Sequence, residues 1–382
     1  MPCETARGYH GGVHPVLFRL PLPWVGVVPI YTWGVMLGIS LIVGWYLTLG
    51  RAQADGLPRE MLANAYVITA LAALLGARLL FVVTNPTDAE DTSIFELRSG
   101  GMVAYGGFLG GFLATVLYMR WKRFPLLPWA DVGVLSLAAG LFFTRIGCFL
   151  YGCDFGHRLS ESAPGWLKRL GTFPHWPEGT VQGGDGSEPW AHHLEQGFIP
   201  PDAEASLPVH PTQLYEAGVG LALLALLLWM RPRRQFRGQS FLVFVFLYGF
   251  ARFAIEFLRD DAQRGSVPPS VAAHVLYPLT FALFAGAFIV GVAPSIRNKT
   301  VRLATQVAFA LVPLVAFFRM RPEAYALAPE AKLSTSQFLG LATALGAAWA
   351  YRVFAGAAQA NPEGAMARIV WEGEEKEEEP TT

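Results

Sequence analysis

The sequence predicts an all-α, polytopic integral membrane protein with about nine transmembrane helices. Hydrophobic residues make up 53% of the 382-residue chain, and charged residues only 15%, well below the share in soluble domains. Apolar runs of about 18 residues or more recur along the chain and are long enough to cross a bilayer. They occupy residues 30–49, 61–84, 101–119, 129–151, 213–230, 240–258, 272–292, 301–318 and 333–355.

These runs predict helices, because backbone groups in lipid must be paired within the protein and the runs lack the alternation of barrel strands. Residues 1–29 carry charge, proline and glycine, so we expect an external N-terminal segment without a cleavable signal peptide. Residues 361–382 include six glutamates after Trp371 and predict an acidic, disordered cytoplasmic tail.

The distribution of basic residues predicts an N-out, C-in orientation. On this orientation the inside segments carry more lysine and arginine than the outside ones, as the positive-inside rule requires. One inside segment, after the fifth run, contains Arg231, Arg233, Arg234 and Arg237. The formal net charge of the chain is zero, which gives no indication of a nucleic-acid partner.

A long segment, 152–212, separates the fourth and fifth runs and faces the outside on this orientation. It is rich in glycine, proline, tryptophan and histidine and is too long for a simple connection. Two interpretations stay open, a flexible loop or a cap over a site that opens outward.

Three arginines lie inside predicted spans: Arg78, Arg145 and Arg252. Arginine within a bilayer is costly, and each of the three falls in the outer half of its span. Glu256 follows Arg252 by one helical turn, and Tyr248 precedes it by one. We expect a net positive pocket near the outer leaflet that suits a phosphate. The alternative is that the arginines snorkel to the interface.

The third run begins with repeated glycine pairs. Gly106 and Gly107 each stand four residues before another glycine, a spacing that lets two helices approach closely. Tyr105 starts the outer half of the same run. Its hydroxyl either enters the cationic site or belongs to the ordinary interfacial belt of tyrosines.

The cysteines are too few for a disulfide framework. Arg145, Cys148 and Gly152 share one helical face, and Cys153 meets Cys148 only if Gly152 ends the helix. Cys148, Cys153, Asp154 and His157 have side chains that can bind metals, but their spacing matches no ordinary zinc site, so we predict neither a metal site nor a cofactor. Both cysteines are interpreted as small packing residues.

Local patterns in order along most of the chain resemble the bacterial prolipoprotein diacylglyceryl transferase family. They are IYTWGVMLG (30–38), GARLLFVV (76–83), GGMVAYGGFLGG (100–111), TRIGCFLYG (144–152), HPTQLYE (210–216), LYGFARFAIEFLRDD (247–261) and LSTSQFLG (333–340).

The resemblance implies an enzyme of the bacterial cytoplasmic (inner) membrane whose active site faces the outer leaflet. It implies transfer of the diacylglyceryl group of phosphatidylglycerol to the lipobox cysteine of a prolipoprotein signal peptide, with glycerol phosphate released. Arg145 and Arg252 match the family's essential arginines and are expected to hold the phosphate. Glu256 matches the glutamate of the Y-G-x-x-R-F-x-x-E pattern, and Trp33 stands where a family tyrosine is usual.

Several departures from the family's pattern leave other functions open. Tyr105 stands at the position of a histidine, proposed as the base for the incoming thiol, and a tyrosine hydroxyl donates to phosphate better than it accepts a proton. Cys148 replaces an asparagine and Cys153 a glutamate. The alternatives are a related transferase with a different acceptor, and a lipid-binding or transport protein without transfer chemistry.

The resemblance also divides the chain. Residues 30–261 form the transferase-like domain, 262–332 an inserted helical pair, and 333–360 the final helix, which makes seven family-like helices and two inserted ones. The candidate catalytic residues are Arg145, Arg252 and Tyr105. The candidate substrate-binding residues are Arg78, Trp33, Tyr248, Glu256, Gly106, Gly107, Cys148 and Gly152.

Overall fold

A computed structural model describes residues 13–23, 26–85, 101–176, 180, 186–260, 265–324 and 328–366. Two predictions fall partly outside these residues: the external N-terminal segment, of which residues 1–12 and 24–25 are not described, and the disordered tail beyond residue 366. The first residues of the predicted tail, Pro362–Ala365, form a short helix instead.

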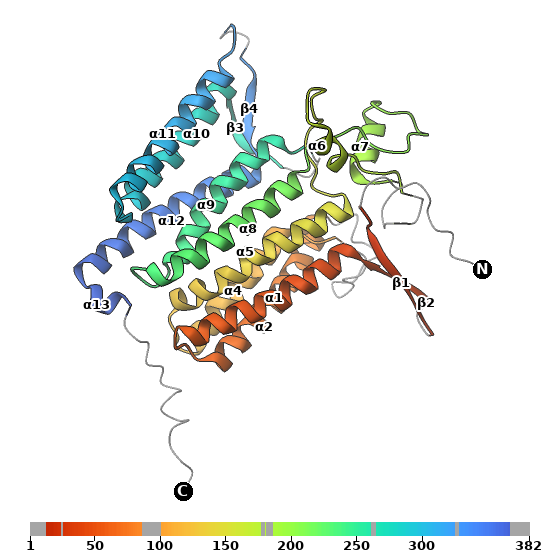
Figure 1. Cartoon of the computed structure of the whole chain (residues 1–382). Coiled ribbons are helices and arrows are strands. Elements are labelled where there is room, and N and C mark those ends of the chain that lie inside the picture. Colours follow the sequence, from red (N-terminus) through yellow and green to blue (C-terminus); the bar gives the residue numbers. More distant parts are fainter. Residues whose placement is uncertain are drawn as a thin grey trace.

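Long helices that run side by side form the body of the protein (Figure 1). Their bounds are α1 Thr32–Ala54, α2 Arg59–Thr84, α4 Ala104–Trp121, α5 Leu126–Tyr151, α8 Thr212–Met230, α9 Gln239–Ile255, α10 Ala273–Ala287, α11 Lys299–Met320 and α12 Thr335–Ala360. The shorter elements are helices α6 Gly165–Leu170, α7 Glu188–Glu195 and α13 Pro362–Ala365, and strands β1 Val16–Leu22, β2 Gly26–Tyr31, β3 Val267–Ala272 and β4 Glu330–Leu333.

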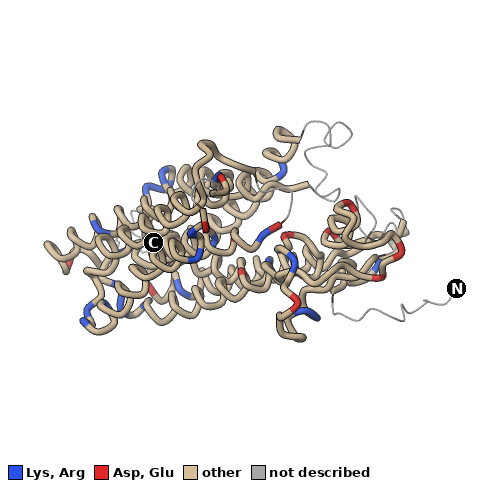
Figure 2. The backbone as a smooth tube through the Cα atoms, turned by 90° about the horizontal axis from the view of Figure 1, so that it is seen from above, with Lys and Arg blue, Asp and Glu red and all other residues tan. Residues whose placement is uncertain are grey.

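The described residues contain eight helices that are long and apolar enough to cross a membrane, which confirms the predicted all-α, polytopic fold. The remaining predicted span, 101–119, is also a helix, the 18-residue α4. It is not among the eight, because its four glycines and its terminal Arg120 and Trp121 reduce its hydropathy. Figure 2 shows that charged residues are sparse along the helical body.

The helices pack in an order that differs from their order in the sequence. Helix α5 lies between α1 and α8, α2 lies against α4, and α9 packs against both α8 and α12 (Figure 1). Helices α10 and α11 pair with each other at one side of the body, where α10 also contacts α12. An aromatic cluster joins these helices, with Phe253 of α9 only 5.1 Å from Phe281 of α10 between ring centroids.

Glycines allow α2 and α4 to touch through their backbones. A Cβ on Gly106 would lie 2.2 Å from the carbonyl oxygen of Gly76, and a Cβ on Gly107 would lie 3.3 Å from that of Ala73. The close approach that the glycine spacing predicts is therefore present.

Gly106→Ala is expected to lower the thermal unfolding midpoint of the protein in detergent. The added methyl group forces two backbones apart, and overpacking of this kind costs about 1–3 kcal/mol. Gly286→Ala in α10 is the matched control, because a Cβ there meets nothing within 4 Å. Equal midpoints for the two variants would contradict the close contact between α2 and α4.

The described part of segment 152–212 is folded, which favours the interpretation of a cap over that of a flexible loop. It contains α6 and α7 and has its own buried cluster, which includes Phe155, Phe173 and Trp176. The backbone N–H of His157 donates to the carbonyl oxygen of Leu258 at 2.7 Å, so the segment is attached directly beyond the end of α9. It lies at the same end of the body as the hairpin of β1 and β2 (Figure 1).

Ion pairs connect the helices at the opposite end of the body. Arg234, between α8 and α9, lies 3.0 Å from a carboxylate oxygen of Asp131 in α5 and 2.8 Å from one of Asp55 after α1. Asp131 also accepts hydrogen bonds from the backbone N–H groups of Gly238 and Phe241. The arginines that indicated the inside face thus connect three helices.

Candidate functional site

The two arginines expected to hold the phosphate lie close together around one buried carboxylate. Arg145 comes from α5, Arg252 from α9, and Glu216 from the first turns of α8. Oε2 of Glu216 is 2.9 Å from Nε of Arg145 and 4.0 Å from Nη1 of Arg252. Tyr248 donates its hydroxyl hydrogen to the other oxygen of Glu216 at 2.9 Å. Glu216 is only 2% exposed, so this contact between helices is shielded from water.

Arg252 makes the ion pair that its spacing predicts. Its Nη2 lies 2.8 Å from Oε2 of Glu256, one helical turn further on. The same Nη2 donates to the hydroxyl oxygen of Ser336 in α12 at 3.0 Å. Nη1 of Arg252 is buried and makes no hydrogen bond within the described residues. One edge of this guanidinium is therefore fixed, and the other retains a donor.

A second carboxylate, Asp154, joins Arg145 to Arg259. It follows α5 in a left-handed backbone conformation with φ of 59°, and its two oxygens each accept a hydrogen bond from one of these arginines. Burial opposes ionisation, but Arg145 and Arg259 outweigh it and hold the pKa of Asp154 well below its usual range. Asp154 is thus an anion that orients two guanidiniums.

Tyr105 reaches the same network from α4. Its hydroxyl lies 2.7 Å from Oγ of Ser336, which in turn bonds to Arg252. The structure therefore supports the expectation that Tyr105 directs its hydroxyl toward the cationic site rather than only belonging to an interfacial belt.

Arg78 does not join the ion pairs of Arg145 and Arg252 within the described residues. It is 1% exposed and donates from Nη1 to the carbonyl oxygen of Gly101 at 3.1 Å, just before α4. Its guanidinium also lies 5.4 Å from the centroid of the Phe81 ring. Through the described contacts, Arg78 of α2 holds the backbone just before α4 against α2.

Trp33 lies beside the helix that carries Arg145. Its Cα and Cδ1 would be 3.2 and 3.4 Å from a Cβ on Gly147, two residues beyond Arg145. Gly106 and Gly107 lie in the contact between α4 and α2 that is described above. A substrate-binding role for these residues stays a prediction.

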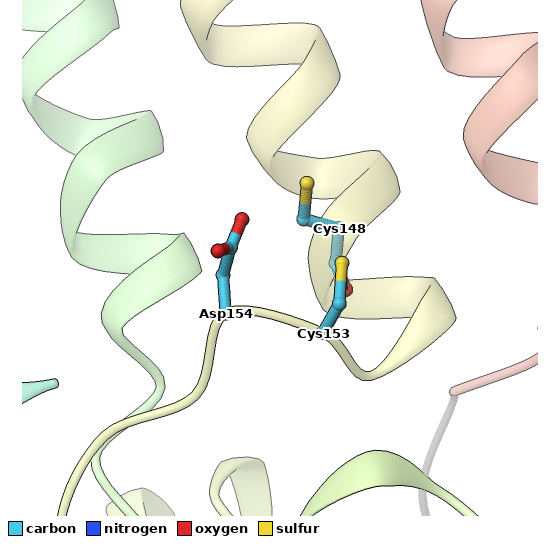
Figure 3. A group of neighbouring side chains, drawn as sticks. All are labelled: Cys148, Cys153 and Asp154. Carbon is cyan, nitrogen blue, oxygen red and sulfur yellow. Dashed lines mark hydrogen bonds between the residues drawn. The ribbon is translucent and has the colours of Figure 1, made fainter. Parts of the chain in front are cut away.

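Gly152 ends α5, as the contact between the cysteines requires. It has φ of 82°, and a Cβ there would lie 3.1 Å from the Trp176 ring. Figure 3 shows Cys148, Cys153 and Asp154 together at this helix end, and their ligand atoms lie within 4.8 Å of one another.

These three groups fit a metal ion poorly. Both oxygens of Asp154 bond to arginines, whose charges oppose a cation. The hydrogen bond with Cys148 and burial raise the pKa of Cys153, which keeps its thiol neutral, whereas a metal binds the thiolate. The expectation that no metal binds here remains a prediction.

The charge of the site differs from the prediction. We expected a net positive pocket in which Glu256 alone offset one arginine. Among the described residues Glu216 and Asp154 join Glu256, so three carboxylates face three arginines and their formal charges balance. The physical reason is burial, since guanidiniums held this close inside a protein need carboxylates between them.

Sequence reasoning missed four residues of this network: Asp154, Glu216, Arg259 and Ser336. Three of them stood within patterns that carried the family resemblance, Glu216 in HPTQLYE, Arg259 in LYGFARFAIEFLRDD and Ser336 in LSTSQFLG. The missed signal was the charged or hydroxyl-bearing side chain inside each of these three patterns. Asp154 was considered only as a metal ligand.

The fold and the site define a class: a polytopic helical membrane protein with arginines and carboxylates paired between its helices. The family model described as prolipoprotein diacylglyceryl transferase matches residues 15–296. The chain belongs to this family and is a transferase.

Relatives named phosphatidylglycerol–prolipoprotein diacylglyceryl transferase align with most of the chain. The Clostridium perfringens enzyme 2 is 30% identical over 65% of this chain and 86% of its own. The Clostridium tetani enzyme is 28% identical over 72% of this chain and 96% of its own. The Thermus thermophilus enzyme is 30% identical over 61% of this chain and 80% of its own.

Proposed function

We propose that this protein transfers the diacylglyceryl group of phosphatidylglycerol to the lipobox cysteine of prolipoproteins. The thiol sulfur attacks the glyceryl carbon next to the phosphate, a thioether bond forms, and the carbon–oxygen bond breaks. Glycerol phosphate leaves, and the thiol proton is released. The observation that carries the proposal is the buried Nη1 of Arg252, which lies 4.0 Å from the carboxylate of Glu216 beside Arg145 but makes no hydrogen bond within the described residues.

Arg145 and Arg252 hold the phosphate in this proposal. Guanidiniums form paired, charge-assisted hydrogen bonds with phosphate oxygens. Negative charge grows on the phosphate as the carbon–oxygen bond breaks, and fixed donors in a dry site stabilise such charge most strongly. Glu216 and Glu256 keep both guanidiniums in place before the lipid arrives, which reduces the reorganisation required during the reaction.

Other predicted residues take supporting roles in this proposal. Tyr248 acts through Glu216, and Tyr105 supplies a hydroxyl donor. Trp33 and Gly152 contribute to the walls of the site next to α5. The nucleophile belongs to the substrate, and Cys148 and Cys153 pack at the helix end.

The proposed setting is the bacterial inner membrane, with the site opening to the outer leaflet. The site lies near the C-terminal ends of α5 and α9, next to the folded segment 152–212 and away from the arginine-rich end at Arg234. Under the positive-inside rule this arrangement supports an N-out, C-in orientation. Phosphatidylglycerol then enters laterally between helices.

We also propose that α12 is the family-like final helix and that 262–332 is an added segment. The hydrogen bond from Arg252 to Ser336 of α12 supports the first part of this proposal. The position of α10 and α11 at the side of the body supports the second part. The family match extends through α10 to residue 296 and thus counts α10 with the family, so the support for an added segment is strongest for α11.

Complementation tests the proposed function. A bacterium depleted of its own transferase is expected to regain lipidated lipoproteins and growth when it expresses the wild-type chain. Expression of the Arg145→Ala variant is expected to restore neither. A well-expressed wild-type chain that yields no lipidated lipoprotein would contradict the proposal. Lipid binding without turnover would then favour a non-catalytic protein, and labelling of a different acceptor would favour a related transferase.

A further inference from the structure

Ser336 connects two side chains that the family resemblance treats separately. It lies in the first turn of α12, where Ser334 caps the helix by accepting from the backbone N–H of Gln337. Its Oγ is 3.0 Å from Nη2 of Arg252 and 2.7 Å from the hydroxyl of Tyr105. Three helices, α4, α9 and α12, therefore meet in one chain of hydrogen bonds.

The charge of Arg252 sets the direction of the first hydrogen bond in this chain. A guanidinium only donates, so Oγ of Ser336 must accept from Nη2 of Arg252. A hydroxyl that accepts a charge-assisted hydrogen bond becomes a stronger donor, because successive hydrogen bonds polarise one another. Either hydroxyl can donate in the 2.7 Å contact between Ser336 and Tyr105. In the arrangement inferred below, Ser336 donates its hydrogen to the oxygen of Tyr105, and the hydroxyl hydrogen of Tyr105 points at another acceptor.

The same contact orients the guanidinium of Arg252. Nη2 is held by Ser336 and by the ion pair with Glu256, whereas Nη1 is buried and has no hydrogen-bond partner within the described residues. A buried donor without an acceptor costs about 1–3 kcal/mol, so a site that keeps one is suited to a ligand that supplies the acceptor.

We propose that Ser336 is a positioning residue that orients the Tyr105 hydroxyl and Nη1 of Arg252 toward one anionic group, the phosphate of the lipid. This inference rests on the proposed transferase function and adds to it a residue and a role. It also explains how a tyrosine serves where the family carries histidine. Tyr105 donates a hydrogen bond to the phosphate, and Ser336 keeps its hydrogen directed there.

The experiment compares Ser336→Thr with Ser336→Val in purified protein. The two side chains have the same shape, but only threonine keeps a hydroxyl. Release of glycerol phosphate is measured with phosphatidylglycerol vesicles and a synthetic lipobox peptide. Ser336→Val is expected to lower kcat about tenfold with little change in KM for the peptide, whereas Ser336→Thr stays near the wild type.

Coupling to Tyr105 provides a test that a purely structural role would not pass. Tyr105→Phe is expected to lower kcat by a similar factor, and the double variant Tyr105→Phe, Ser336→Val no further, because both changes break the same chain. Independent, multiplying losses would contradict the inference. So would equal activity of the threonine and valine variants.

Two controls keep the result decisive. Thermal midpoints in detergent show whether each variant is folded, and Ser336→Cys, which keeps the size but weakens the hydrogen bond, replaces Ser336→Val if that variant unfolds. Activity of Ser336→Cys equal to that of the wild type would overturn the inference. An inactive wild type would contradict the proposed function, whereas an active wild type with an equally active Ser336→Val would contradict only the role of Ser336.

Discussion

Arg145→Lys is expected to lower kcat/KM for the transfer reaction by a factor of about a hundred or more. Arg145 engages Glu216 through Nε and Asp154 through Nη1, and it uses the planar fork of the guanidinium to do so. A lysine ammonium is a compact point charge and cannot reach both carboxylates and a phosphate at once. The measurement is the rate of glycerol phosphate release in vesicles of phosphatidylglycerol.

Arg233→Lys is the matched control for this substitution. Arg233 is exposed at the opposite end of the helices, where it donates to the carbonyl oxygen of Trp229. The control is expected to keep the wild-type rate. Near-normal turnover of Arg145→Lys would contradict the role of Arg145 as the phosphate clamp.

Glu216→Gln is expected to lower both stability and turnover. Glutamine keeps the shape of the side chain but removes the negative charge between Arg145 and Arg252. Loss of one partner from a buried ionic cluster costs about 3–5 kcal/mol, because the remaining charges stay desolvated and repel each other. The expected result is a lower thermal midpoint in detergent together with weak transferase activity.

Glu330→Gln is the matched control, because it removes a carboxylate that is exposed and lies outside the arginine network. Glu330 lies on β4, where it accepts a hydrogen bond from Ser270 at an exposed position, and its replacement is expected to leave the midpoint unchanged. A Glu216→Gln protein as stable and as active as the wild type would show that the arginines do not need the shared carboxylate.

Local patterns in the sequence predicted the helices and part of the site. Long apolar runs are a property of neighbouring residues, and so is the spacing of Arg252 and Glu256, whose ion pair the structure confirms. Gly152 ends α5, which was the stated condition for a contact between Cys148 and Cys153. These features could be predicted without knowing which helices pack against each other.

Contacts between distant segments could not be predicted in this way. Ser336 and Tyr105 are 231 residues apart, and no periodicity connects them. The neutral charge of the site was missed for the same reason, because Glu216 reaches Arg145 from another helix and only the packing of α5 against α8 brings them together.

Helix α5 is fixed at both of its ends, and this has a consequence for the order of events in the reaction. Asp131 binds two backbone N–H groups and Arg234 near one end, and Arg145 binds Glu216 and Asp154 near the other. The two anchors are about 21 Å apart along the helix axis. Sliding of α5 along its axis would break both at once. Arg145 therefore keeps a constant position along α5, and under the proposed transferase function the headgroup of the lipid has to move to meet it.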